Sequence, residues 1–299
     1  MTALSALVKR NCKLYFRDRG MFFSSLITPI ILLVLYVTFL KSVYDDSFRS
    51  ALAAAGATLP DALREGFVGG QLVSSLLAVS CVTVAFCSNL LVIKDRTSGA
   101  RRDLTMAPIS PALLGLGYYL ATLASTLLVN LTAAAACLGY LAIVGWYLSA
   151  ADVALLLLDV VLLTLFGTTL AACVTAPLTT DGQASAVGTI VSAGYGFVCG
   201  AYMPISGFGT GLQHVLSLLP GTYATSLLRN HAMAGVFAEL KRLGCPEAAL
   251  TAIRQGFDCS PSFFGTPVSV GAMYAIVAGS TAVLLAVYLL LSGLPQHRR

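Results

Sequence analysis

The chain has 299 residues, of which 57% are hydrophobic and only 10% are charged. A soluble domain carries roughly 25% charged residues, so the composition excludes an ordinary soluble protein and predicts an all-α integral membrane protein. The net charge is only +5, and the basic residues border apolar runs instead of forming a base-reading face, which argues against nucleic-acid binding.

The first segment, residues 4–19, has the period of an amphipathic helix. Its apolar side chains recur on one face, whereas Lys9, Arg10, Lys13 and Arg17 share the opposite face. A basic helix of this kind lies in the membrane interface with its cations toward water. We therefore predict an N-terminal interfacial helix, since a topology signal alone would need the charges but not the periodicity.

Apolar runs of spanning length follow this helix. A spanning helix needs about 20 mostly apolar residues, and the uncharged stretch 104–151 has room for one helix or two. Lys and Arg concentrate on cytoplasmic flanks. The chain has three basic clusters, at residues 9–19, at residues 94–102 and at the tail residues Arg298 and Arg299, and all three fall on one side only if this stretch crosses once. We therefore predict a single transmembrane domain over residues 1–299, with both termini cytoplasmic and six spans, at 21–40, 71–93, 112–146, 153–177, 184–203 and 268–291.

The segment 204–267, before the last span, is expected on the outer side. Its pattern predicts two short apolar helices at 211–219 and 222–237, separated by the breaker Pro220-Gly221. Neither helix is long enough to cross the membrane. Two such helices joined by a breaker are typical of a re-entrant hairpin, whose turn must be buried by protein.

The eight cysteines show no metal-binding spacing, and no metal site is predicted. Cys245 and Cys259 lie in a polar stretch. They form a disulfide if that stretch faces an oxidising compartment, and otherwise stay free.

Asp159 is the ionisable residue that lies well inside a predicted span. A charge within a membrane is by default a functional hypothesis, and two interpretations stay open here: a structural residue near the outer interface, or a substrate or gating contact. Arg229, if buried, needs an acid or helix-end carbonyls as its partner, and Asp159 is one candidate. The pair Gly196-x-x-x-Gly200 allows close approach of two helices, within one chain or between two chains.

The predicted cytoplasmic loop, residues 94–110, begins with charges of both signs and ends in an apolar patch, Leu104-Thr-Met-Ala-Pro-Ile-Ser110. An exposed apolar patch is typical of a docking surface. Four features follow one another along the chain: a basic interfacial helix, a first span with Pro29, this loop closing on Leu-x-x-x-Pro-Ile-Ser, and Leu218-Leu-Pro-Gly-Thr-Tyr-Ala224 before the last span. Together they resemble the permease subunit of the type-2 class of ABC exporters. The resemblance covers essentially the whole chain.

The resemblance implies a permease that works with a dimer of a separate ABC ATPase, with a second permease copy or a paralogue, and with membrane lipid in the cell membrane. ATP and Mg would bind to the ATPase. This chain contains no Gly-Lys pair and hence no phosphate-binding loop, so neither a cofactor nor a catalytic residue is expected on it. The segment outside the first span is longer than in polysaccharide exporters, which favours an amphiphilic substrate such as a lipid, a drug or a peptide-like molecule.

Two sets of candidate residues follow from the resemblance. Coupling to the ATPase is expected of Lys9, Arg10, Lys13, Arg17, Arg96, Arg101, Arg102, Leu104, Met106, Pro108 and Ile109. The substrate pathway or gate is expected to include Phe22, Phe86, Asn89, Asp159, Tyr195, Phe197, Tyr202, Tyr223, Arg229 and His231.

Two other classes of function are alternatives to a permease. An ion-coupled secondary transporter typically shows inverted repeats and broken helices, and a membrane-embedded enzyme needs clustered polar groups at depth. Neither pattern is evident in the sequence.

Overall fold

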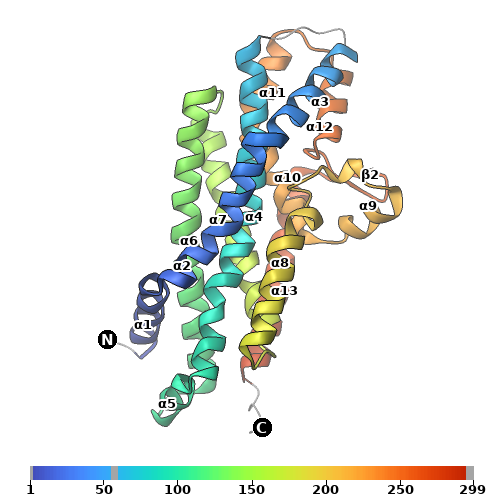
Figure 1. Ribbon diagram of the computed structural model, residues 1–299. Coiled ribbons are helices and arrows are strands. Elements are labelled where there is room, and N and C mark those ends of the chain that lie inside the picture. Colours follow the sequence, from blue (N-terminus) through green and yellow to red (C-terminus); the bar gives the residue numbers. More distant parts are fainter. Residues whose placement is uncertain (1–2, 55–59, 294–299) are drawn as a thin grey trace.

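The chain is mostly helical (Figure 1). The computed structural model describes residues 3–54 and 60–293. The predicted orientation also used the tail residues Arg298 and Arg299, which lie outside the described residues. The elements are, in chain order, α1 (Ala3–Arg17), α2 (Arg19–Leu35), the π-helical turn η1 (Tyr36–Leu40), α3 (Lys41–Ala54), α4 (Asp61–Thr97), α5 (Ala100–Met106), α6 (Pro111–Val144), α7 (Ala150–Thr175), α8 (Asp181–Val198), η2 (Ile205–Gly207), α9 (Thr210–Ser217), α10 (Pro220–Ala232), α11 (Ala234–Arg242), α12 (Glu247–Gly256), β1 (Ser262–Phe263), β2 (Thr266–Pro267) and α13 (Val270–Gly293).

Within the described residues, five helices are long and apolar enough to cross a membrane. The first two predicted spans are parts of longer helices, since α2 continues through η1 into α3 without a break and α4 begins at Asp61. The ambiguous uncharged stretch holds one long helix, α6, as a single crossing requires. The five candidates are Arg19–Ser50, Asp61–Thr97, Pro111–Val144, Ala150–Thr175 and Val270–Ser292.

The predicted span 184–203 differs from the structure at its end. Its helix, α8, has 18 residues and ends at Val198, because the chain turns at Gly200, where φ is +74°. At about 1.5 Å per residue an 18-residue helix is about 27 Å long, slightly less than the hydrocarbon core of a bilayer. The helix is not among the five candidates, so a sixth crossing stays a prediction.

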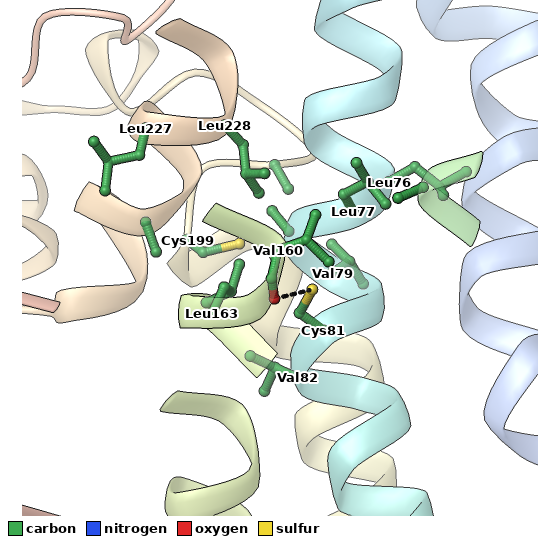
Figure 2. Packing of buried hydrophobic residues seen from close by; sticks show 14 of the residues in the cluster. Leu76, Leu77, Val79, Cys81, Val82, Val160, Leu163, Cys199, Leu227 and Leu228 are labelled. Carbon is green, nitrogen blue, oxygen red and sulfur yellow. Dashed lines mark hydrogen bonds between the residues drawn. The ribbon is translucent and has the colours of Figure 1, made fainter. Parts of the chain in front are cut away.

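The core of the bundle is organised around α4. This helix is apolar on all sides, and nearly all of its residues from Gly66 to Phe86 are buried, which is the pattern of a helix surrounded by others. Figure 2 shows its side chains meeting those of α7 and α10, and the Cys81 thiol lying 3.8 Å from the Val160 carbonyl oxygen. The helices α6, α7, α8, α10 and α2 all pack against it.

The ends of the bundle differ in composition. At one end, called here the α5 end, lie α1, α5 and the last turn of α13; at the other, the α12 end, α3, α11 and α12 lie together (Figure 1). The predicted helix 222–237 is in fact two helices, α10 and α11, divided at Met233. The helix α10 is almost wholly buried among α4, α7 and α13, whereas α9 and the two short antiparallel strands project from the side of the bundle.

Candidate functional site

The helix α1 lies against the bundle with the face that its periodicity predicts. Leu7, Asn11 and Tyr15 form a buried stripe, and this stripe packs mainly on α6. The predicted cationic face is only partly free: Lys9 and Lys13 are exposed, and Arg17 is exposed as well. Arg10 instead turns back toward the bundle.

Arg10 ties α1 to the end of α4. Its Nη1 donates to Asp95 Oδ2 at 2.6 Å, and the Tyr118 hydroxyl from α6 donates to the same oxygen at 2.6 Å. The hydrogen bond to Asp95 raises the pKa of Arg10 above its ordinary value. A second link joins the α1–α2 junction to α4, where the Lys94 ammonium bonds to Asp18 and lowers the pKa of that carboxyl. Two ion pairs, Arg10 with Asp95 and Lys94 with Asp18, therefore tie the N-terminal segment to α4.

The loop after α4 presents one apolar side chain outward and keeps two others inward. Met106 is 85% exposed, whereas Leu104 and Ile109 pack against the buried cluster of Leu7, Leu114 and Tyr118. The predicted contact helix 104–109 is displaced, because the helix here is α5, which starts after Gly99 in the left-handed region and ends at Met106. Arg102 and Pro108 are also exposed.

Arg96 is half-buried at the end of α4. Its guanidinium reaches the carboxyl end of α7, where it donates to the Ala176 carbonyl at 3.0 Å and to the Leu178 carbonyl. Arg101, on α5, is also half-buried.

Two of the predicted pathway residues meet in an apolar groove of about 260 Å³ between α4, α7 and α8. Phe86 and Tyr195 line it together with Ile190, which is 70% exposed. Phe197 and Tyr202 pack edge to face nearby, with ring centroids 5.0 Å apart. The groove is suited to an apolar or amphiphilic molecule.

Three other predicted pathway residues lie elsewhere. Phe22 packs against Tyr15 at the α1–α2 corner. Asn89 is buried near the α5 end and donates to Thr175. Tyr223 donates to the Ser217 carbonyl at 2.5 Å and lines a separate polar cavity of about 400 Å³. The predicted pathway set is therefore distributed over at least three places.

Arg229 forms its ion pair with Asp258 and not with Asp159. The Arg229 side chain is buried on α10, and its Nη1 lies 3.1 Å from Asp258 Oδ2. Asp258 also accepts from the backbone amides of Ile205 and Ser206, and Arg229 donates to the Gly200 carbonyl. This cluster joins α10 to the segments that follow α8 and α12.

Asp159 instead joins three helices. The carboxylate on α7 accepts from the Tyr274 hydroxyl of α13 at 2.5 Å and lies 2.5 Å from His231 Nδ1 of α10. Asp159 is only 2% exposed. No local pattern in the sequence indicates Tyr274 or Asp258, because each becomes a partner only through the tertiary fold.

The two cysteines considered for a disulfide are free thiols in the structure. Both are buried in one apolar cluster at the α12 end. Burial raises the pKa of Cys259 to about 12 and also raises that of Cys245, which disfavours the reactive thiolate.

The small residues Gly196 and Gly200 shape a turn and not a helix crossing. A Cβ on Gly196 would lie 2.3 Å from the ring of Tyr202 in the same chain, and Gly200 takes the positive φ that the turn requires. Close approach of a second helix is therefore not what these two glycines accommodate.

Comparison with protein families agrees with this architecture. The sequence from residue 2 to residue 232 matches a family model described as "ABC-2 type transporter". Comparison with individual curated proteins gave no match.

Proposed function

The chain belongs to the ABC-2 type transporter family, and from this membership we propose that it is the transmembrane subunit of an exporter that moves an amphiphilic substrate outward. Family membership makes it a multi-pass membrane protein and a permease that works with an ATPase partner. ATP hydrolysis, with its Mg, takes place on that partner in this proposal. The proposed function rests on the match of residues 2–232 to the family model.

The α5 end supports the proposed coupling to the ATPase. Met106 and Arg102 are both exposed on α5, and Met and Arg are enriched in protein interfaces. Leu104 packs against the cluster of Leu7, Leu114 and Tyr118, and Arg10 holds α1 to Asp95. In this proposal, a movement of the loop that carries Met106 is passed to the bundle through these contacts.

Replacing Met106 by aspartate is expected to reduce recovery of the ATPase with the tagged chain by more than about tenfold, because a carboxylate would be buried at the centre of the contact. The measurement is co-purification from native membranes, together with ATP hydrolysis by the recovered complex. Thr105→Asp is the matched control, since Thr105 is exposed on the same short helix but is polar already. Equal recovery of the ATPase with both variants would remove Met106 from the proposed contact.

The apolar groove supports an amphiphilic substrate. Phe86 and Tyr195 line it beside exposed apolar side chains of α8, and α2 exposes a further apolar face that includes Ile27, Ile31 and Val34. Two permease copies, or this chain and a related one, that met over these faces would enclose an apolar route. In this arrangement the ATPase switches the access of the route from inside to outside.

The proposed topology has six spans, including α8, in the cell membrane, with both termini cytoplasmic. The α5 end carries α1 and its exposed lysines, as the distribution of Lys and Arg in membrane proteins favours for a cytoplasmic face. The α12 end is then outside.

Cysteine labelling in intact cells tests this orientation. Ala248→Cys on α12 is expected to react with a membrane-impermeant maleimide, whereas Ser98→Cys before α5 is expected to react only after the cells are opened. Both positions are exposed in the structure, and the unsubstituted chain gives the background from its own cysteines. The reverse labelling pattern would invert the topology.

A further inference from the structure

A small cavity of about 40 Å³ lies at the α5 end, between the ends of α4, α6, α7 and α13. Arg96 of α4 and Arg101 of α5 both line it, beside Tyr118 and Tyr288. Among the described residues that line it, none is acidic. The cavity thus gathers two guanidinium groups without a carboxylate.

Neither arginine has an ion-pair partner in the described part of the chain. Arg96 uses Nη1 on the carbonyls at the end of α7, but its Nε is buried without a hydrogen-bond partner. The neighbouring acid, Asp95, is already bound by Arg10 and Tyr118. A buried, unpaired guanidinium N–H is costly, so the site is incomplete without an acceptor.

The sign of the local charge suits an anion. The carboxyl ends of α4 and α7 each contribute about half a negative charge, and the amino end of α6 contributes about half a positive charge. Two guanidinium groups outweigh these partial charges, so the lining is positive overall. A phosphodiester carries the opposite charge.

The shape of the cavity suits the same group. A volume of about 40 Å³ is more than a single water needs, so the cavity admits a small polar group such as the non-ester oxygens of a phosphodiester. Pro111 and Leu291 are exposed lining residues, so the mouth opens between α6 and α13. Beyond it, Leu289 and Leu290 present exposed apolar side chains on α13. Four candidate spans end around this cavity, at the level where lipid headgroups lie.

We propose that this cavity binds the phosphodiester of an anionic phospholipid, with Arg96 and Arg101 as donors and the acyl chains along α13. Basic pockets between spans on the cytoplasmic side are suited to anionic headgroups. The site is separate from the apolar groove at Phe86 and Tyr195. Lipid binding at this site needs only the folded permease, without the ATPase or a transported substrate. Failure of the proposed transport function would leave it untouched.

Thermal unfolding of the full-length chain, purified and delipidated in detergent, tests the proposal. Dioleoyl phosphatidylglycerol is expected to raise the unfolding midpoint with a saturable dependence, whereas dioleoyl phosphatidylcholine and inorganic phosphate are not. Arg101→Gln is expected to weaken the apparent affinity for phosphatidylglycerol about tenfold, since it removes a charged hydrogen bond. Arg101→Lys is expected to retain part of the affinity.

Arg102→Gln is the matched control, because Arg102 is adjacent and exposed but does not line the cavity, and it is expected to bind like the unsubstituted chain. Arg101 has no ion pair to lose among the described residues, so its replacement is expected to leave the fold intact. Equal affinity in the Arg101→Gln and Arg102→Gln variants overturns the site. Equal stabilisation by phosphatidylcholine overturns the preference for an anionic lipid, and saturable stabilisation by inorganic phosphate assigns the cavity to the free anion and overturns the lipid.

Discussion

Replacing Arg229 by methionine is expected to destabilise the protein by about 3–5 kcal/mol, the usual cost of removing one partner of a buried ion pair. Arg229 and Asp258 are 1% and 5% exposed, so the substitution would leave the Asp258 carboxylate buried with no counter-charge. The same substitution would free the Gly200 carbonyl, which Arg229 also binds. The end of α8 and the segment after α12 would then lose their common anchor on α10.

The measurement is the thermal unfolding midpoint in detergent. Arg242→Met is the matched control, because Arg242 on α11 forms an exposed ion pair with Glu239 three residues away, and it is expected to leave the midpoint unchanged. The double replacement Arg229→Met with Asp258→Asn is expected to recover part of the loss, since it removes both buried charges. The asparagine keeps an acceptor for the backbone amides of Ile205 and Ser206 and tolerates the positive φ of this position. If Arg229→Met and Arg242→Met unfold at the same temperature, the buried pair has no structural role.

The local pattern of the sequence predicted the elements better than the contacts. The apolar face of residues 4–19 contains Leu7 and Tyr15, which are buried as the period requires. The same period placed Arg10 on the free cationic face, yet Arg10 binds Asp95, 85 residues further along the chain. A helical period identifies faces, but it carries no information on a partner so distant in the sequence.

Helix ends were the other point at which hydropathy was insufficient. The apolar run 184–203 continues past the end of α8, because Cys199 and Ala201 are apolar although the backbone already turns at Gly200. Hydropathy records the solvent that a residue prefers and not its backbone angles. By contrast, the breaker Pro220 was a reliable signal, since it occupies the first turn of α10, where its missing N–H costs nothing.

The partner predicted for Arg229 was wrong for a physical reason. Asp159 was the buried acid visible within a predicted span, whereas Asp258 lies in a polar stretch that hydropathy assigns to the surface. The fold returns the end of α12 over α10, and Asp258 becomes buried there beside Arg229. The requirement that a buried arginine has an acid was sound, but the sequence could not say which acid.

Replacing Asp159 by leucine is expected to cost about 2–4 kcal/mol, because it leaves the hydrogen-bonding groups of His231 and Tyr274 inside the bundle without their acceptor. Both contacts are 2.5 Å long and come from two different helices, α10 and α13. Asp159 therefore holds α7, α10 and α13 in one arrangement, which is what a structural interpretation of this residue requires.

Thermal unfolding again measures the effect, with Asp46→Leu as the matched control, since Asp46 is an exposed aspartate on α3. In the double variant Asp159→Leu with Tyr274→Phe, the two losses are expected to be less than additive, because the phenylalanine removes the hydroxyl that Asp159→Leu would leave unpaired. Strict additivity would show that the Tyr274 hydroxyl does not depend on Asp159. A normal unfolding midpoint combined with lost transport would instead assign Asp159 to gating, because the bundle would then be stable without this carboxylate.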